Sequence, residues 1–184
     1  MSNRRGLLVV ISGPSGVGKG TVCRRLLEDE RFKFSVSATT RTRREGEKDG
    51  IHYHFLSVED FQKKIENDEF LEWAKVYGNY YGTLRSSVLA EIDAGYHVLL
   101  DIDTRGAKQV KEKMPKARLF FLLPPSAEEL ESRLRGRGTD SDEVIRKRLD
   151  GFAYEYEQRK YYDYVVVNDQ VDRVVAEIKR LLEQ

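Results

Sequence analysis

The chain has 184 residues, of which 40% are hydrophobic and 34% are charged. That size predicts one compact domain with room for small insertions. Because 32 Lys and Arg residues oppose 31 Asp and Glu residues, no global field favours nucleic acid or a membrane as a partner. A lone cysteine, Cys23, excludes an intrachain disulfide and is expected to be a buried hydrophobe. Without a secretory leader or an apolar run of about 18 residues, the sequence predicts a cytoplasmic protein.

A glycine-rich loop near the start has the pattern of a phosphate-binding P-loop. It follows an apolar run over residues 7–11 and precedes a helical pattern that begins near Val22. Glycines in such a loop can adopt positive φ, so that backbone N–H groups converge on an anion at a helix N-terminus. Lys19 is expected to reach the β- and γ-phosphates. The predicted ATP-binding residues are Gly13, Pro14, Ser15, Gly16, Val17, Gly18, Lys19, Gly20 and Thr21.

The metal ligands are less directly indicated. A hydroxyl directly after the P-loop lysine ordinarily ligates Mg²⁺, but Gly20 stands there and Thr21 comes one residue later. A buried strand expected over residues 97–103 ends in Asp101 and Asp103, and ligands bind beyond the carboxyl ends of parallel strands. Thr21 and Asp101 are therefore the candidate Mg²⁺ ligands, and capping of the next helix is the alternative role for Asp103.

Residues 37–84 predict a small, mostly β insertion that is rich in tyrosine. We expect strands over 34–37 and 52–56, a helix capped by Ser57, and a hairpin over 70–84 that turns at Gly78 and Asn79. If the hairpin strand alternates strictly, the Glu72 side chain points to the face of the sheet opposite to that of Leu71 and Trp73. The alternation over 52–56 also places two histidines on one strand face, where an ordinary surface strand is favoured over a metal site.

A loop in this insertion carries Arg41, Arg43 and Arg44. Their neighbours are hydroxyl residues rather than acids, so we expect that nothing local neutralises these cations. That composition favours an anion site over a solvated turn.

The second half of the chain alternates strands, expected over 119–123 and 164–168, with helices that begin after Ser126, near Ser141 and at residue 171. The first two helices are expected to bury Ala127, Leu130, Leu134, Ile145, Leu149, Phe152 and Tyr156. Arginines at 133, 135 and 137, separated by Gly136 and Gly138, suit a mobile flap. The whole predicts an α/β fold with a parallel sheet: a core of 1–36, 85–134 and 149–184, the insertion over 37–84, and a lid over 135–148.

A P-loop, strand-end acids and two arginine clusters together favour phosphoryl transfer between two anions. Cationic lids bring such substrates together and keep water out, because water would hydrolyse the donor. A motor ATPase or a GTPase would instead need a water-positioning element, and the sequence has no N-K-x-D motif for a guanine base.

The order of short motifs along the chain resembles guanylate kinases. The blocks are GPSGVGKGT, SVSATTRTRREGE, DG-x-HY-x-F, FLEWA, GNYYGT, LLDID-x-x-G, PPS, RGRGT and VVND. The resemblance covers nearly the whole chain and implies ATP:GMP phosphotransfer with Mg²⁺, in guanine nucleotide salvage and recycling. It implies a GMP-phosphate site of Arg41, Arg44, Tyr53 and Tyr81, a guanine site of Ser37, Glu72, Thr83 and Asp103, and Asn168 near the adenine. It also implies Lys19, Arg41, Arg137 and Arg148 as catalytic residues.

The implied base site agrees with guanine chemistry. Guanine presents N1–H and N2–H₂ donors beside an O6 acceptor, so its reader needs carboxylates next to hydroxyl donors. Two alternatives stay open: a catalytically silent phosphopeptide-binding module on the same fold, and a kinase of another nucleoside monophosphate. Silent modules typically lose the P-loop lysine and glycines, which this chain keeps. The chain is expected to be a monomer or a weak homodimer.

Overall fold

The structure is a computed structural model that describes residues 5–184. These residues form two compact units, and each is described by itself. One unit comprises the described residues up to Leu8 together with Arg31–Leu100 and Arg105–Ala117, and the other comprises Val9–Glu30, Asp101–Thr104 and Arg118–Gln184. The first contains most of the predicted acceptor residues, and the second contains the P-loop.

A five-stranded sheet has the order β2-β7-β1-β8-β9. Its strands are β1 (Leu8–Ser12), β2 (Phe32–Phe34), β7 (His97–Asp101), β8 (Arg118–Leu123) and β9 (Tyr164–Val167). The pairs β1–β8, β2–β7 and β8–β9 are parallel, which confirms the predicted parallel sheet. Strand β1 is buried along its whole length, as expected of a strand covered on both faces.

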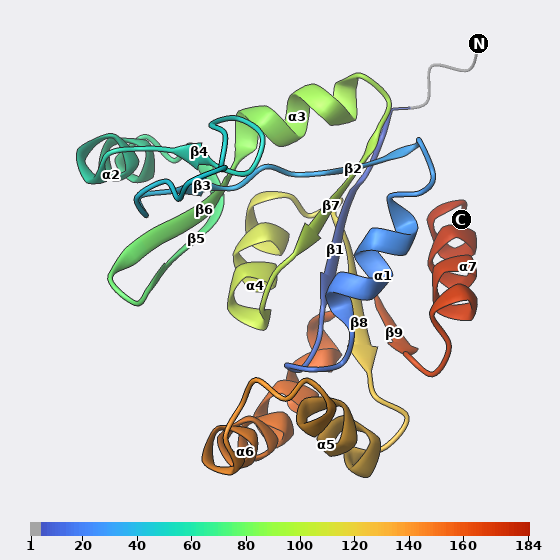
Figure 1. The fold of residues 1–184 in the computed structure, drawn as a ribbon. Helices are drawn as coiled ribbons and strands as arrows, with labels where there is room; N and C mark the ends of the chain where they lie inside the picture. The colour runs from blue at the N-terminus through green and yellow to red at the C-terminus, as the bar shows by residue number, and fades with distance from the viewer. Residues whose placement is uncertain (1–4) are drawn as a thin grey trace. The chain divides into compact units, whose positions relative to one another are not determined.

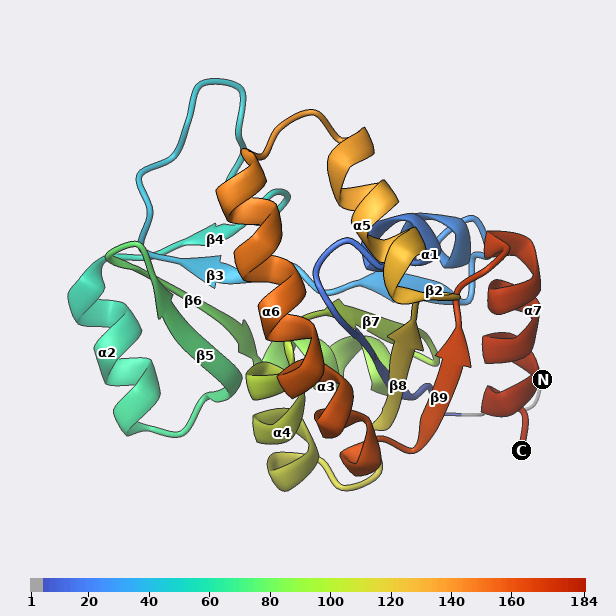
Figure 2. The same cartoon turned by 90° about the horizontal axis from the view of Figure 1, so that it is seen from below.

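The unit with the P-loop carries α1 (Lys19–Leu26), α5 (Ala127–Gly136), α6 (Asp142–Gln158) and α7 (Val171–Leu182). Figures 1 and 2 show α1 beside α7. Helices α5 and α6 pack together through Leu130, Leu134 and Ile145. Their N-caps follow the sequence, because Ser126 accepts from the N–H of Glu129 and Ser141 from that of Val144.

Three expectations about α5 and α6 were wrong. Ala127 is exposed in the first turn of α5, and Tyr156 is 36% exposed on α6. Gly136 is helical, so the helix carries Arg133 and Arg135 and only residues 137–141 connect α5 to α6. The two buried leucines of α5, one turn apart, hold that helix regular through the glycine.

The other unit has a four-stranded sheet of order β4-β3-β6-β5. Its strands are β3 (Ala38–Thr39), β4 (His54–Phe55), β5 (Phe70–Val76) and β6 (Asn79–Leu84), and its helices are α2 (Val58–Glu66), α3 (Arg85–Asp93) and most of α4 (Thr104–Lys113). Helix α2 begins at its predicted cap, Ser57, and packs Phe61 on Phe70 with ring centroids 4.3 Å apart. All four strands lie within the predicted insertion.

Several boundaries in this unit differ from expectation. The strand expected over 34–37 was wrong for most of its length, because β2 ends at Phe34, β3 begins at Ala38, and residues 35–37 belong to neither strand. The hairpin turns at Tyr77 and Gly78, with φ of +48° and +83°, one residue earlier than predicted. Both values suit a two-residue turn whose twist matches the strands. His52 lies in a turn, where its Nδ1 accepts from the N–H of Lys48, so the two histidines do not share a strand face.

Over residues 5–184, no helix is both long and apolar enough to cross a membrane. The same residues contain no group of three or more His, Cys, Asp or Glu side chains arranged to hold a metal ion. Cys23 is buried, and burial raises the pKa of its thiol to about 12. The thiol is therefore an inert core group at neutral pH, as predicted.

Candidate active site

The P-loop between β1 and α1 has the backbone conformation that anion binding requires. Gly13, Gly16 and Gly18 have φ of +145°, +88° and +103°, which confirms their predicted positive φ. Lys19 begins α1, and its Nζ donates to the carbonyl oxygens of Gly13 at 2.9 Å and Pro14 at 3.3 Å. The ammonium thus lies across the loop, within reach of a phosphate that the loop would hold.

Two side chains distant in sequence, those of Arg133 and Asn168, hold the P-loop through its backbone. The carbonyl oxygen of Val17 accepts from Asn168 Nδ2 at 2.8 Å and from Arg133 Nη1 at 3.1 Å. Arg133 Nη2 also donates to the carbonyl of Asn168 at 3.0 Å. A Cβ on Gly18 would lie 2.7 Å from Asn168 Nδ2, so glycine is required there. Asn168, expected near the adenine, is only 3% exposed, and its amide holds the P-loop.

Carboxylates surround the Lys19 ammonium. Burial lowers the pKa of Lys19, and the negative charges of Asp101, Glu155 and Asp103 oppose that shift. Burial also raises the pKa values of Asp101 and Glu155. The predicted neighbourhood of strand-end acids and P-loop is therefore present, and a Cβ on Gly20 would lie 3.8 Å from Asp101 Oδ2.

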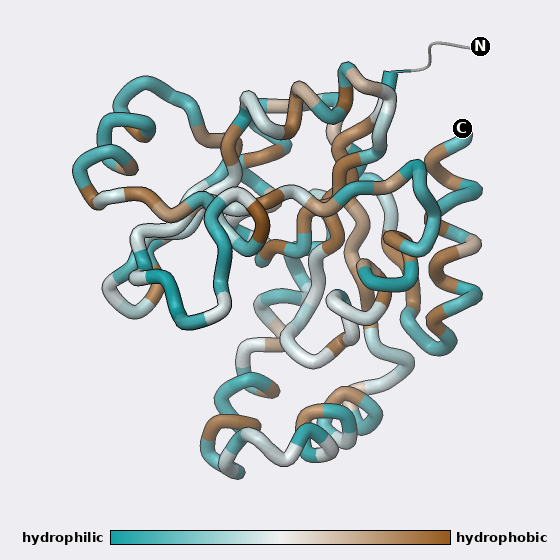
Figure 3. The backbone as a smooth tube through the Cα atoms, turned by 45° about the horizontal axis from the view of Figure 1, so that its top comes forward, coloured by the Kyte–Doolittle hydropathy of each residue, from teal (hydrophilic) through white to brown (hydrophobic). Residues whose placement is uncertain are grey.

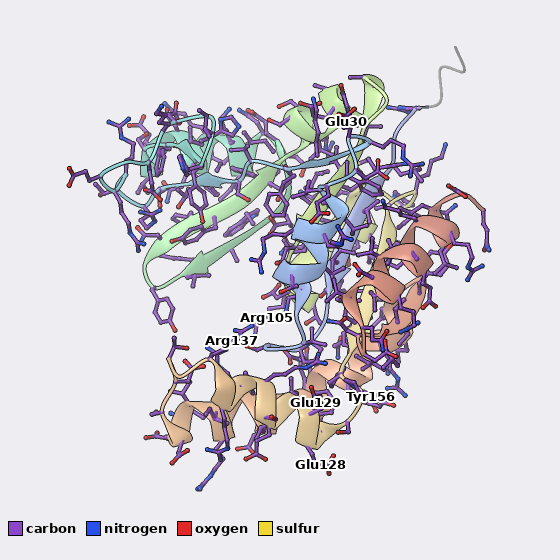
Figure 4. All side chains as sticks on the ribbon, turned by 45° about the vertical axis from the view of Figure 1, so that its right-hand side comes forward. Glu30, Arg105, Glu128, Glu129, Arg137 and Tyr156 are labelled. Atoms are coloured by element: carbon purple, nitrogen blue, oxygen red, sulfur yellow. The ribbon has the colours of Figure 1, made fainter. Side chains whose placement is uncertain are left out.

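Helix α6 also contacts the P-loop. Arg148 Nη1 donates to Ser15 Oγ at 2.5 Å, and Arg148 Nη2 lies 3.4 Å from Asp140 Oδ2. Glu155, seven residues later and hence on the same helix face, accepts from the backbone N–H of Ser15. Arg137 follows the last turn of α5, while Glu128 and Glu129 project from its first turn (Figure 4). The charge of Arg137 also lowers the Lys19 pKa, so this cation lies near the loop.

In the other unit, Glu72 and Thr83 form a buried polar pair. The Thr83 hydroxyl donates to Glu72 Oε1 at 2.6 Å, and the carboxylate residue is only 9% exposed. Glu72 faces Thr83 across β5 and β6, and an irregularity between Phe70 and Glu72 shifts the register. The prediction of strict alternation was therefore wrong, because the irregularity buries Phe70, Leu71 and Glu72 in succession.

The register of the sheet relates a third residue, Ser37, to the pair of Glu72 and Thr83. Ala38 pairs with Gly82 in the antiparallel β3–β6 ladder, so Ser37 comes opposite Thr83, with Glu72 on the next strand. Cross-strand neighbours share a face of the sheet. Continued by one residue, this register would bring the Ser37 hydroxyl beside Thr83 and Glu72, and the role of the three in reading guanine stays a prediction. Asp103 belongs to the unit that holds the P-loop, and its part in reading guanine stays a prediction.

The arginine-bearing loop lies between β3 and β4 and is mostly hydrophilic (Figure 3). The Arg41 guanidinium carbon lies 5.5 Å from the centre of the Tyr53 ring, and the rings of Tyr53 and Tyr81 are 6.2 Å apart. Three of the four predicted phosphate-binding side chains are therefore together. Arg44 follows on the same loop, and its side chain makes no hydrogen bond or ion pair with any other described residue.

The expectation that nothing local neutralises these arginines was wrong. Arg41 Nη2 lies 2.7 Å from Glu47 Oε1, and the other carboxylate oxygen accepts from the backbone N–H of Arg44 at 2.7 Å. The loop folds back on itself, and this brings together residues six positions apart. A prediction from the adjacent residues alone therefore misjudged the local charge around these arginines.

Comparison with known proteins agrees with the geometry of both units. The family model for guanylate kinase matches residues 5–184. The chain is a member of the guanylate kinase family. A guanylate kinase of Caldanaerobacter subterraneus is 52% identical over 97% of the chain and 87% of that protein, and one of Desulfitobacterium hafniense is 51% identical over 99% and 92%. The crystal structure of the Anaplasma phagocytophilum guanylate kinase, 37% identical, aligns with a TM-score of 0.72 over all of this chain and 87% of that one.

Three residues at this guanylate kinase site were missed from the sequence. Arg133 was grouped with the flap but holds the P-loop, Glu155 was not singled out on α6, and Glu47 was overlooked beside the arginines. A helical-wheel projection would have found Glu155, because seven residues separate it from Arg148. Neither of the other two contacts follows from a local pattern, since each depends on how the chain folds back.

Proposed function

We propose that the chain transfers the terminal phosphoryl group of ATP to GMP, giving ADP and GDP. The buried pair of Glu72 and Thr83 carries this proposal, because a desolvated carboxylate beside a hydroxyl needs a donor-rich partner. The guanine N1–H and N2–H₂ groups are such donors. Adenine has an acceptor at N1, which would face the carboxylate acceptor instead of donating to it.

The acceptor phosphate would bind where the cations and phenols of the same unit converge. Arg41 and Arg44 supply charge, and Tyr53 and Tyr81 supply hydroxyl donors. The rings of the two tyrosines meet edge to face, so their packing limits where the hydroxyls can go. Charge, shape and hydrogen bonding would then select a phosphorylated nucleoside over a free one.

The donor would bind on the P-loop. The three positive-φ glycines aim backbone N–H groups at its phosphates, and Lys19 would leave the carbonyls that it now contacts for the β- and γ-phosphates. Arg137 and Arg148 would balance the charge that spreads over the transferring group. Arg148 already contacts the loop through Ser15, so only a small side-chain movement is needed.

The chemistry that Mg²⁺ would supply, when bound with ATP, is positive charge that offsets the charge of the phosphates. Asp101 fits a role as its carboxylate partner, because burial raises the Asp101 pKa and a cation would relieve that cost. Thr21 fits poorly, since it is exposed on α1 and its hydroxyl accepts from Arg24 Nη2 at 3.2 Å. We therefore propose Asp101, acting through water, and not Thr21, as the principal protein contact of the metal.

The test is a coupled assay of ADP release with ATP and each nucleoside monophosphate in turn. We expect turnover with GMP and a preference over AMP of roughly 10⁴-fold, as for sites that pair a buried polar group. ADP release that does not depend on a monophosphate would indicate an ATPase. Binding of GMP without turnover would favour the silent-module alternative.

The reaction would return GMP to the guanine nucleotide pool, which is the role of salvage and recycling. ATP and GMP are cytoplasmic metabolites, and we propose the cytoplasm as the place of action. A monomer or weak homodimer stays the prediction for the oligomeric state. Light scattering with and without both nucleotides measures it directly.

A further inference from the structure

Glu47 is a charged residue beside the predicted acceptor-phosphate site. It lies in the loop between β3 and β4, six residues after Arg41. Its carboxylate contacts both predicted phosphate-binding arginines, one through its side chain and the other through its backbone. One carboxylate thus pairs with the Arg41 guanidinium and holds the backbone at Arg44.

The contacts of Glu47 build a closed turn. Its Oε2 accepts from the N–H of Arg44 at 2.7 Å, and its own N–H donates to the Arg44 carbonyl at 3.2 Å. The two residues therefore fix each other, in the reciprocal manner of a capping box. Because the backbone holds Oε2, Oε1 is directed at Arg41 Nη2, 2.7 Å away.

Arg41 is held from several directions at once. Its backbone N–H donates to the Thr39 hydroxyl at 3.1 Å, and its Nη1 donates to the Thr42 carbonyl at 2.9 Å. The guanidinium lies against the rings of Tyr53 and Phe55, at 5.5 and 5.9 Å. The side chains of Arg41 and Glu47 are only 15% and 18% exposed, so neighbouring atoms cover most of both.

The arginine keeps donors for a ligand. A guanidinium has five N–H groups, and those to Glu47 and Thr42 account for the hydrogen bonds that its side chain makes within the described residues. The remaining N–H groups are free to bind a phosphate. A carboxylate on one edge of the guanidinium fixes the direction in which its other N–H groups point.

We propose that Glu47 is a positioning residue for the acceptor phosphate: by holding the guanidinium of Arg41 and the turn at Arg44, it presets both cations for the phosphate of GMP. This inference rests on the proposed function for the identity of the ligand. Preorganisation lowers the conformational cost that binding would otherwise pay to order two long side chains. Without the Glu47 carboxylate, Arg41 would sample rotamers that point into solvent.

Charge repulsion alone predicts that loss of the Glu47 charge changes GMP affinity in the opposite direction, so the two explanations can be told apart. Glu47 is an anion next to the site of a dianion, so loss of its charge alone would strengthen GMP binding by removing repulsion. Under the positioning role, loss of the charge weakens GMP binding. The direction of the change therefore separates a positioning residue from a mere competitor for the arginines.

The experiment measures GMP and guanosine binding by calorimetry for the wild type, Glu47→Gln and Glu47→Asp. We expect Glu47→Gln to weaken GMP binding by about tenfold to a hundredfold, the range of one charge-assisted hydrogen bond. Guanosine, which lacks the phosphate, should bind all variants equally. Glu47→Asp should behave like Glu47→Gln, because its shorter side chain keeps the charge but withdraws the carboxylate.

Glu45→Gln is the matched control. It removes the same charge from the same loop, and Glu45 is exposed and makes no hydrogen bond or ion pair with another described residue. We expect GMP to bind this variant as well as the wild type or slightly better. In the kinetic assay, Glu47→Gln should raise KM for GMP and leave kcat and KM for ATP nearly unchanged.

Tighter or unchanged GMP binding by Glu47→Gln would overturn the proposal, and so would an equal loss for guanosine. An unfolded variant is recognised by circular dichroism, and Glu47→Asp then carries the test. The proposed function fails separately, if the wild type binds GMP but does not phosphorylate it. The binding comparison still decides the role of Glu47 in that case.

Discussion

The proposed donor and acceptor regions of this guanylate kinase would hold phosphate by different means. The P-loop presents backbone N–H groups, with three glycines at positive φ and one lysine. The acceptor loop presents side chains, and the Glu47 carboxylate pairs with the Arg41 guanidinium. A cradle made from backbone is rigid once the chain is folded, whereas one made from arginines needs an internal counter-ion to keep its shape. The two regions should therefore respond differently to loss of a charge.

The largest expected effect is at Lys19, the single cation within the P-loop. Lys19→Met keeps most of the aliphatic length but removes the charge, and should lower kcat at least about a hundredfold, as when one preorganised electrostatic donor is lost. Steady-state kinetics measures it. Lys147→Met, on the exposed face of α6 and paired within residues 5–184 only with Glu143, is the control and should be silent. Normal turnover by Lys19→Met would refute phosphoryl transfer on this loop.

The next effect is on base choice. Glu72→Gln turns an acceptor into a donor that must face a guanine N–H, and should lower kcat/KM for GMP by roughly ten- to a hundredfold. The ratio of kcat/KM for GMP to kcat/KM for AMP should decrease, and KM for ATP should stay nearly unchanged. Glu66→Gln, at the exposed end of α2, is the control. Unchanged GMP kinetics would remove Glu72 from the site and weaken the guanine assignment.

The arginines of the two units should separate by kinetic parameter. Arg44→Ala should mainly raise KM for GMP, and Arg137→Ala should mainly lower kcat, each by about tenfold. The neighbouring exposed residues Arg43 and Arg146 provide alanine controls that keep the net charge change the same. Identical phenotypes for Arg44→Ala and Arg137→Ala would contradict distinct acceptor and lid roles.

The sequence predicted the donor region far better than the acceptor loop, for a physical reason. Positive φ is a local property, so the glycines of the P-loop and the Ser126 and Ser141 caps could be read from a few adjacent residues. The pairing of Arg41 with Glu47 depends on a loop that folds back on itself. The successive burial of Phe70, Leu71 and Glu72 depends on a register shift between β5 and β6. Pattern and spacing do not encode such tertiary contacts.

The smallest effects, on stability without ligand, should have opposite signs in the two regions. Burial lowers the pKa of Lys19 below its ordinary value of 10.5, so its charged form destabilises the folded state at neutral pH. The Arg41 side chain and the Arg44 N–H instead lower the pKa of Glu47 to about 2 from an ordinary value of 4.5, so its charged form stabilises the folded state. In one region burial outweighs the attraction of nearby carboxylates for the cation, and in the other an ion pair stabilises the anion.

Calorimetric melting of the nucleotide-free protein should therefore show a higher Tm for Lys19→Met and a lower Tm for Glu47→Gln at pH 7. The Lys19→Met gain should vanish as pH rises toward 10.5, where the unfolded chain also loses the lysine proton. The Glu47→Gln deficit should persist down to pH 4.5 and shrink as pH falls through about 2. Each shift should be only a few degrees, because a chain of this length moves by about 2–4 °C per kcal/mol and solvent screens the Glu47 pair. Shifts of the same sign would show that the two regions do not differ in how they balance charge before the substrates bind.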